Sequence, residues 1–359
     1  MTGENKGIQK LTGFVNRYFG WRNWSVLVYN SVLENLFVLF YIALRKEFDV
    51  FRFSVDFIIF LLYSMFCTTY GYLVNDLGDR ELDKRQGKAN TFANDSPLKA
   101  SLVVWLFLLL SIAAGLRFVG NHLFLPAWLC WVFISTAYSL KPIRLKERGK
   151  AGLLFVVLAQ RVLPTLLIFF AFQHYQWLDV VVITVYVFFR GLSSDINHQL
   201  EDLRQDAAAG AETFAVKTGN RKTRFIFRVS LELEKVLLFA CLFIMYRELP
   251  GLKIIGIPPL LAAWIFYLII YIASLGKIVL HKGAVDVNPF APGRKDIFQF
   301  MHHTFPSDLL PLGFMVLLLY TEWRYIFLLL VFILFRRMYS LDVIRNSFPV
   351  RMVVRLIGK

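Results

Sequence analysis

Long runs of apolar residues, separated by short polar segments, recur along almost the whole chain. Most of these runs are close to the roughly 20 residues that an α-helix needs to cross a bilayer. We predict spans at residues 25–44, 55–74, 100–119, 122–140, 151–172, 176–194, 226–246 and 255–276. The region 307–337 then holds one more span, or two short spans broken at 320–324. The pattern predicts an all-α fold, a polytopic transmembrane bundle of nine or ten helices.

The segments that flank this pattern differ from it. Residues 1–24 mix aromatic and charged residues and predict an N-terminal interfacial segment, followed by a transmembrane domain at 25–337. Residues 338–359 alternate Arg with apolar residues, as in a basic cytoplasmic tail that lies on anionic lipid. The polar stretch 277–305 predicts a short interfacial helix near 295–303, with His302 and His303 at the membrane surface.

Composition and charge support a membrane protein. Apolar residues make up 57% of the chain, against roughly 45–50% in soluble domains. The net charge of +15 is concentrated in alternate loops, at 78–100, 141–150, 204–224 and 277–295. This is the positive-inside pattern, and it predicts that these loops face the cytoplasm. The loop 45–53 breaks the pattern, and no motif supports nucleic-acid binding.

Two runs of aspartates follow the second and the sixth predicted spans. Asp76, Asp79 and Asp83 have helical spacings i, i+3 and i+7, so they share one helix face. Asp195, Asp202 and Asp206 share a face in the same way. The two runs are four spans apart, so they open on the same side of the membrane, as does the basic loop 141–150. Carboxylate oxygens suit Mg²⁺, which commonly completes its coordination shell with substrate phosphates. The pattern therefore predicts an enzyme that binds a lipid diphosphate.

Three motifs in order are similar to those of a known family. Asn75-Asp76-x-x-Asp79-x-x-x-Asp83 resembles the first signature of the UbiA superfamily of intramembrane prenyltransferases. Asp195-x6-Asp202-x3-Asp206 resembles its second signature, and Tyr138-Ser139-x-x-Pro142-x-Arg144-Leu145-Lys146 resembles the loop between them. The resemblance covers roughly residues 15–340. It implies a UbiA-like bundle around a central cavity and a Mg²⁺-dependent transfer of a polyprenyl group from its diphosphate to an acceptor.

The resemblance also implies roles for individual residues. The expected Mg²⁺ ligands are Asn75, Asp76, Asp79, Asp83, Asp195, Asp202 and Asp206. Four of these acids are expected to be catalytic: Asp76, Asp79, Asp202 and Asp206. The expected diphosphate-binding residues are Lys88, Tyr138, Arg144 and Lys146. Polar residues inside spans usually face a cavity or a partner, so Glu34 and Asn35, together with His198 in the second run, are candidates for acceptor binding.

Two other functions remain open on the sequence. A terpene cyclase of the same fold would close the prenyl chain on itself and would need no acceptor. A lipid-binding or transport protein would carry its acids near the middle of the membrane on broken helices. The acceptor, the length of the prenyl chain and the oligomeric state are not assigned. No targeting signal is recognised, so we expect a bacterial-type inner membrane.

Overall fold

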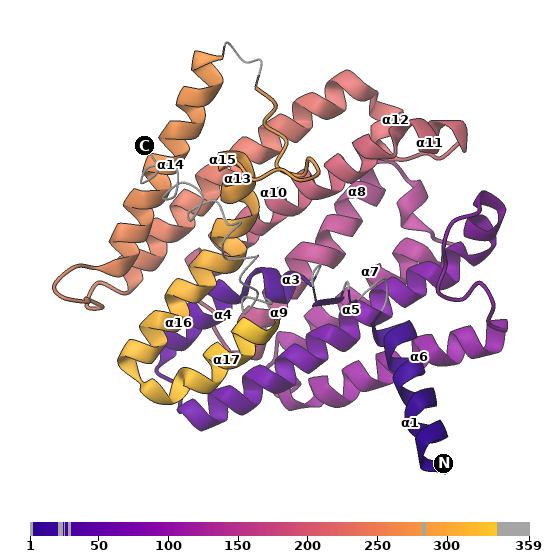
Figure 1. The fold of residues 1–359 in the computed structure, drawn as a ribbon, viewed down its shortest axis with the longest axis horizontal. Helices are drawn as coiled ribbons and strands as arrows, with labels where there is room; N and C mark the ends of the chain where they lie inside the picture. The colour runs from indigo at the N-terminus through magenta and orange to yellow at the C-terminus, as the bar shows by residue number, and fades with distance from the viewer. Residues whose placement is uncertain (1–2, 21–23, 25, 28–29, 282–284, 336–359) are drawn as a thin grey trace.

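The computed structural model describes residues 3–20, 24, 26–27, 30–281 and 285–335 (Figure 1). The predicted basic tail, 338–359, lies outside these residues. The first half of the described chain forms α1 (Gly3–Phe14), η1 (Val15–Phe19), α3 (Ser31–Glu34), α4 (Leu36–Lys46), α5 (Val50–Gln86), α6 (Pro97–Gly115), η2 (Leu116–Phe118), α7 (Phe124–Ser139), η3 (Leu145–Glu147), α8 (Lys150–Val157), η4 (Leu158–Val162) and α9 (Leu163–Ala171). The second half forms α10 (Trp177–Glu201), α11 (Leu203–Ala208), α12 (Phe214–Thr218), α13 (Asn220–Glu248), α14 (Pro259–Leu280), α15 (Ile297–Gln299), η5 (Phe300–Leu309), α16 (Leu310–Thr321), η6 (Trp323–Tyr325) and α17 (Ile326–Phe335).

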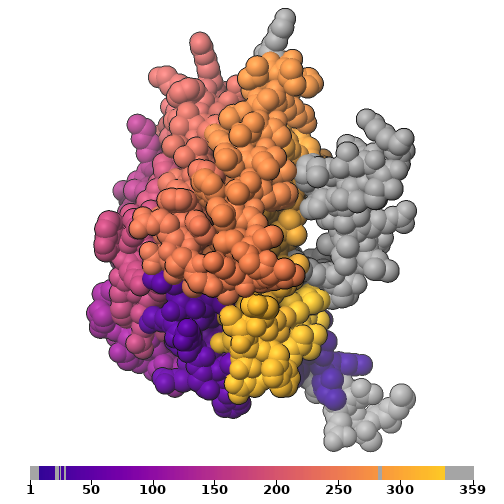
Figure 2. All heavy atoms as spheres, turned by 90° about the vertical axis from the view of Figure 1, so that its left-hand side faces the viewer, coloured from indigo at the N-terminus to yellow at the C-terminus, as the bar shows by residue number. Residues whose placement is uncertain are grey.

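The predicted all-α membrane fold is confirmed. In the part of the chain that the structure describes, six helices are long and apolar enough to cross a membrane, and Phe124–Ser139 and Trp323–Phe335 are shorter apolar helices. Helix α10 packs along α13, and α5 packs along α6 (Figure 1). Helix α14, orange in Figure 2, lies on the face shown there, and its residues Ile265, Ile269 and Ile272 are exposed. Exposed isoleucines on a membrane-length helix suit contact with lipid.

Helix α5 is the longest element, with 37 residues from Val50 to Gln86. The Asp49 side chain caps its start, accepting from the Arg52 amide at 2.8 Å. Gly87 ends it in a left-handed conformation, with φ of 66°. At 1.5 Å per residue the helix is about 55 Å long, so it extends past a hydrocarbon core of roughly 30 Å. The first aspartate motif lies on the extending part.

Two elements differ from the sequence prediction, and the last region takes one of the two forms predicted for it. The first span is interrupted at Asn35, whose side chain donates to the Ser31 carbonyl at 2.8 Å. The last region takes the two-part form, because the chain becomes extended at Glu322. The predicted interfacial helix near 295–303 is wrong, since Ile297–Thr321 forms one membrane-length helix. Its His302 side chain is buried against Glu234 and is not exposed at the surface.

Candidate active site

A cavity of about 1420 Å³ runs into the bundle from the end where both aspartate runs lie. Its mouth is lined by members of all three motifs: Asn75, Asp79, Asp83, Lys88, Tyr138, Arg144, Lys146, Asp195, His198, Asp202 and Asp206. Its inner part is lined largely by apolar and aromatic side chains, including Phe60, Tyr63, Trp131 and Leu167. The cavity therefore joins a charged mouth to an apolar interior.

Asp79 lies at the centre of the charge pairs on the first motif. Its carboxylate contacts Arg144 Nη2 at 2.9 Å and Lys146 Nζ at 2.5 Å. Lys146 also donates to Asn75 Oδ1 at 2.9 Å. Burial lowers the pKa of Lys146, and the charge of Asp79 opposes that shift. Two of the three expected diphosphate-binding cations, Arg144 and Lys146, thus contact the expected metal ligands directly.

Arg144 is held in place by the backbone of two helices. Its Nη1 donates to the carbonyls of Gly78 at 3.0 Å and Ser139 at 3.3 Å. Helices α5 and α7 can approach this closely because Gly78 has no side chain: a Cβ there would lie 2.5 Å from the Ser139 oxygen. The close packing of α5 on α7 therefore fixes the guanidinium beside Asp79.

Asp76 and Asp83 bond to the loop that follows α5. Asp76 is 1% exposed, and its Oδ2 accepts from the Thr91 hydroxyl at 2.6 Å and the Thr91 amide at 3.2 Å. Asp83 Oδ2 accepts from Asn90 Nδ2 at 2.8 Å. Asp83 lines the cavity, whereas Asp76 is not among the lining residues. The structure thus brings Asn75, Asp79 and Asp83 to the cavity and holds Asp76 beneath the loop.

The second run lies at the end of α10 and along α11. Asp195 Oδ2 is buried and has no hydrogen-bond partner among the described residues, although the side chain lines the cavity. Asp206 lies one turn from Asp202, and burial together with the Asp202 charge raises its pKa. Clustered acids with unsatisfied oxygens attract a cation. His198, with 74% of its side chain exposed, lies 3.8 Å from Asp202.

These residues fit Mg²⁺ as the predicted cofactor. Within the described ranges, no group of three His, Cys, Asp or Glu side chains is close enough to hold a metal by itself. Mg²⁺ is commonly bound by one or two carboxylates plus substrate phosphates, so it does not need such a cage. The unsatisfied oxygen of Asp195 and the acids on both sides of one mouth supply the hard ligands that this arrangement requires.

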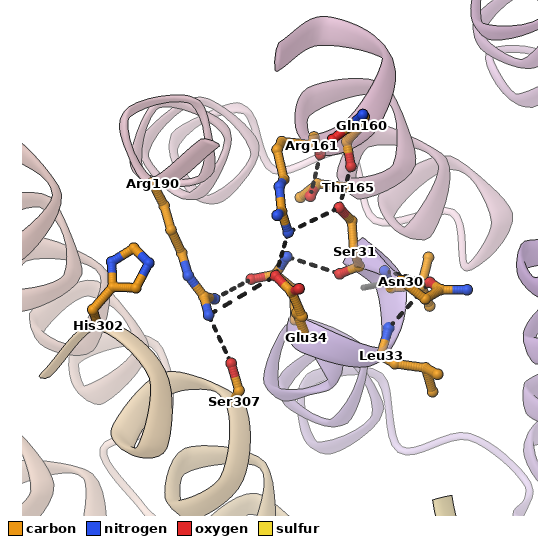
Figure 3. A network of polar contacts seen from close by, with 12 residues as sticks. Asn30, Ser31, Leu33, Glu34, Gln160, Arg161, Thr165, Arg190, His302 and Ser307 are labelled. Atoms are coloured by element: carbon orange, nitrogen blue, oxygen red, sulfur yellow. Dashed lines mark hydrogen bonds and ion pairs between the residues drawn. The ribbon is translucent and has the colours of Figure 1, made fainter. Parts of the chain in front are cut away.

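Two of the acceptor-binding candidates, Glu34 and Asn35, are not among the residues that line the cavity. They belong to a polar network between spans, in which Figure 3 shows Glu34 with Arg161 and Arg190. Glu34 forms an ion pair with Arg161 and lies 4.0 Å from Arg190. Asn35 Oδ1 accepts from Arg190 at 3.2 Å. Arg190 also donates to Ser307 at 2.7 Å. Paired charges of this kind tie helices together inside a membrane.

Several residues that support the site have no role assigned to them from the sequence. Asn90 and Thr91 hold the acids of the first motif, and Asp95 anchors their loop to the N-terminal segment. Glu147 pairs with Arg144. Polar residues in a loop are common, so only the folded contacts separate these residues from ordinary surface positions.

Comparison with known proteins agrees with this geometry. The chain is 31% identical over 181 residues to digeranylgeranylglyceryl phosphate synthase of Sulfurisphaera tokodaii, covering 49% of this chain and 61% of that protein. It is 26% identical over 209 residues to probable homogentisate phytyltransferase 2 of Oryza sativa, covering 55% and 54%. The matches thus span between half and two thirds of each relative.

Solved structures share the fold. A UbiA homologue from Archaeoglobus fulgidus bound to DMAPP and Mg²⁺ superposes with a TM-score of 0.58 at 17% identity, covering 84% of this chain and 98% of that one. A structure described as digeranylgeranylglyceryl phosphate synthase gives a TM-score of 0.53 at 14% identity, covering 86% and 98%.

A sequence model of the UbiA prenyltransferase family matches residues 35–301, which is most of the chain and includes all three motifs. The structural neighbours have the same helical membrane fold. The chain belongs to the UbiA prenyltransferase family.

Proposed function

We propose that this protein is a Mg²⁺-dependent intramembrane prenyltransferase. It would transfer a polyprenyl group from a prenyl diphosphate to an acceptor and release diphosphate. The observation that carries the proposal is a cavity whose mouth holds members of both aspartate runs and the three expected cations, Lys88, Arg144 and Lys146, and whose interior is largely apolar. A diphosphate head and an isoprenoid tail match the two parts of this cavity.

The reaction breaks the bond between the first prenyl carbon and the diphosphate oxygen, and both electrons leave with the diphosphate. Mg²⁺ would supply Lewis-acid stabilisation of that leaving charge. Lys146 would move from Asp79 to the diphosphate, which frees an Asp79 oxygen for the metal, while Arg144 stays beside Asp79 and would bind the diphosphate from there. Asn75, Asp76, Asp79 and Asp83 on one side, and Asp195, Asp202 and Asp206 on the other, remain the proposed ligand set, with Asp76 acting from beneath the loop.

The interior would shield the electron-deficient prenyl group from water until the acceptor attacks. Aromatic faces such as those of Tyr63 and Trp131 stabilise positive charge. The acceptor gives up a proton as the new bond forms. We retain His198, on the exposed rim, as the proposed residue nearest to an incoming acceptor, whereas Glu34 and Asn35 act through the network behind the cavity.

The donor is proposed to be a long isoprenoid diphosphate. The relatives' names carry geranylgeranyl and phytyl groups, and two neighbouring structures bind DMAPP or GPP with Mg²⁺. The distribution of Lys and Arg supports a site on the cytoplasmic face of a bacterial-type inner membrane. The transmembrane domain is proposed to occupy 25–337.

Diphosphate release from the purified full-length protein tests the proposal. With geranylgeranyl diphosphate and a membrane extract as the source of acceptors, we expect Mg²⁺-dependent release, reduced at least 100-fold in Asp79→Asn and Asp202→Asn. Asp56→Asn is the matched control, because Asp56 lies on the same helix as Asp79 but pairs with Arg117 at 2.6 Å, away from the cavity. A product formed without acceptor would indicate a cyclase. No release from any chain length of donor would exclude prenyl transfer.

A further inference from the structure

Asp95, in the loop between α5 and α6, has a buried carboxylate that accepts hydrogen bonds from the N-terminal segment. Asp95 is 5% exposed. Its Oδ2 accepts from Arg17 at 2.7 Å and from the Tyr18 hydroxyl at 2.8 Å. Its Oδ1 accepts from Lys99 at 2.7 Å. Charge-assisted bonds from three donors hold this carboxylate in one place.

The same loop holds the first aspartate motif on its other side. Thr91 donates two hydrogen bonds to Asp76, and Asn90 Nδ2 donates to both the Asp83 carboxylate and the Asp76 carbonyl at 2.8 Å. Arg17 contacts this loop at a second point, since it also donates to the Thr91 carbonyl at 2.9 Å. Two motif acids are therefore connected to the N-terminal segment through a few consecutive loop residues.

Aromatic packing completes the connection. Phe92, in the same loop, is fully buried and stacks on Tyr18 with ring centroids 5.9 Å apart. Tyr18 itself is 2% exposed. On the motif side, Arg80 of α5 donates to the Asp95 carbonyl. The loop is thus fixed between η1 and α5 by contacts on both of its faces.

We propose that Asp95 is a positioning residue for the metal site. It anchors the loop to Arg17 and Tyr18, so that Asn90 orients Asp83 at the cavity and Thr91 holds Asp76 in place beneath the loop. A carboxylate has about four acceptor sites, so these bonds still leave Asp83 oxygen capacity for a ligand. The inference rests on the proposed prenyl-transfer function and adds a role for the N-terminal segment in it.

The test measures how much Mg²⁺ the full-length protein needs to bind a donor analogue. The probe is geranylgeranyl thiolodiphosphate, whose C–S bond resists ionisation, so binding is read without turnover. Asp95→Asn keeps the shape but loses the charge, and we expect its half-saturating Mg²⁺ concentration to rise at least fivefold. Asp56→Asn, which removes a similar ion pair from α5, is expected to leave that concentration unchanged.

A second readout needs no ligand. Tryptic cleavage after Arg85 and Lys88 is expected to be faster in Asp95→Asn than in Asp56→Asn, because the loop loses its anchor. If Asp95→Asn fails to fold, Tyr18→Phe removes one hydrogen bond to Asp95 and keeps the ring on Phe92; it is expected to raise the Mg²⁺ requirement by a smaller factor.

The outcomes separate this inference from the function on which it rests. Wild-type protein that binds no analogue at any Mg²⁺ concentration contradicts the proposed prenyl transfer. Wild-type protein that binds the analogue, together with a folded Asp95→Asn or Tyr18→Phe variant with an unchanged Mg²⁺ requirement, overturns only the positioning role.

Discussion

At the scale of single residues, the site is organised by charges that pair with one another before any substrate arrives. Asp79, Arg144 and Lys146 form one cluster, although the sequence assigns them to two different ligands. Helical spacing and motif order were enough to find all three. They did not predict that Arg144 and Lys146 pair with Asp79, because a sequence pattern does not show which loop residues contact a given helix.

Lys146→Met should weaken donor binding more than it slows the chemistry. The variant loses a cation that lies beside Asp79 and Asn75, at the place proposed for the diphosphate. We expect KM for geranylgeranyl diphosphate to rise at least tenfold, measured by diphosphate release. Lys150→Met, which removes an exposed cation of the same loop region, is the control. Equal KM values in the two variants would contradict the role of Lys146.

Glu34→Gln should destabilise the fold, because it leaves Arg161 without its charge partner inside the membrane. Removing one partner of a fully buried ion pair costs roughly 3–5 kcal/mol, and we expect a smaller cost here because the two side chains are 12% and 14% exposed. We expect a lower melting temperature in detergent, partly restored in the double variant Glu34→Gln/Arg161→Met. A single variant as stable as the wild type would show that the pair has no structural role.

Asp95 should make stability depend on pH in acid. Burial acts to raise its pKa, but bonds from Lys99 and Tyr18 and the charge of Arg17 outweigh burial, so the pKa lies below 3.8 in the folded protein. The stabilisation is therefore complete above pH 3.8 and is lost as the pH falls through the lower folded value. The melting temperature of Asp95→Asn should be lower than that of the wild type at pH 7, and the gap should close in this acid range. A gap that stays constant with pH would contradict the assignment.

At the scale of elements, the spans were predictable and their interruptions were not. Apolar length locates α6, α10 and α14 to within several residues, whereas α5 continues to Gln86, well past the predicted end at 74. The break at Asn35 depends on contacts with Ser31 and Arg190, which come from the folded bundle. The π-helical turns of residues 300–309, which contain Pro306, likewise have no apolar signature. Hydropathy measures how long a span is, and tertiary contacts decide where it bends.

Gly78→Ala should separate α5 from the end of α7. Its Cβ would lie 2.5 Å from the Ser139 carbonyl oxygen, so the backbones must move apart and the Arg144 bonds to both carbonyls must lengthen. Overpacking of this kind costs roughly 1–3 kcal/mol. We expect a lower melting temperature and at least a tenfold loss of diphosphate release.

Gly71→Ala is the matched control on the same helix, since its Cβ would meet only the Trp131 ring, at 3.7 Å. It should retain most of the stability and activity. If the two variants behaved alike, the close approach at Gly78 would not be what positions Arg144.

At the scale of the whole molecule, both aspartate runs lie at one end of the bundle, as the distribution of Lys and Arg predicts. The fold also explains the cations of loop 45–53, which break that distribution. Arg45 and Lys46, in the loop that breaks the pattern, bond to the opposite end of the bundle from the aspartate runs. Arg45 reaches the Glu248 carbonyl at 2.9 Å and Gln176 at 2.8 Å, and Lys46 reaches the Gln173 carbonyl at 2.6 Å. Hydrogen bonds between loops therefore account for these two cations, whichever side of the membrane they face.

Cysteine labelling should confirm that the two ends of the bundle face different compartments. In a variant whose native Cys67, Cys130 and Cys241 are replaced by Ser, single cysteines at Gly120 and Glu212 mark opposite ends. An impermeant maleimide added to intact cells should label position 120, and position 212 only after lysis. Labelling of both positions in intact cells would contradict the topology.

The charged mouth and apolar interior of the cavity also affect how the reaction rate should be described. A substrate that fits both parts is an amphiphile, and amphiphiles of this kind dissolve in the bilayer more readily than in water. The donor concentration that sets the rate is therefore its mole fraction in the bilayer and not its molar concentration in the buffer. Diluting the sample with buffer should leave the rate per enzyme nearly constant, whereas diluting the membrane with inert lipid should lower it.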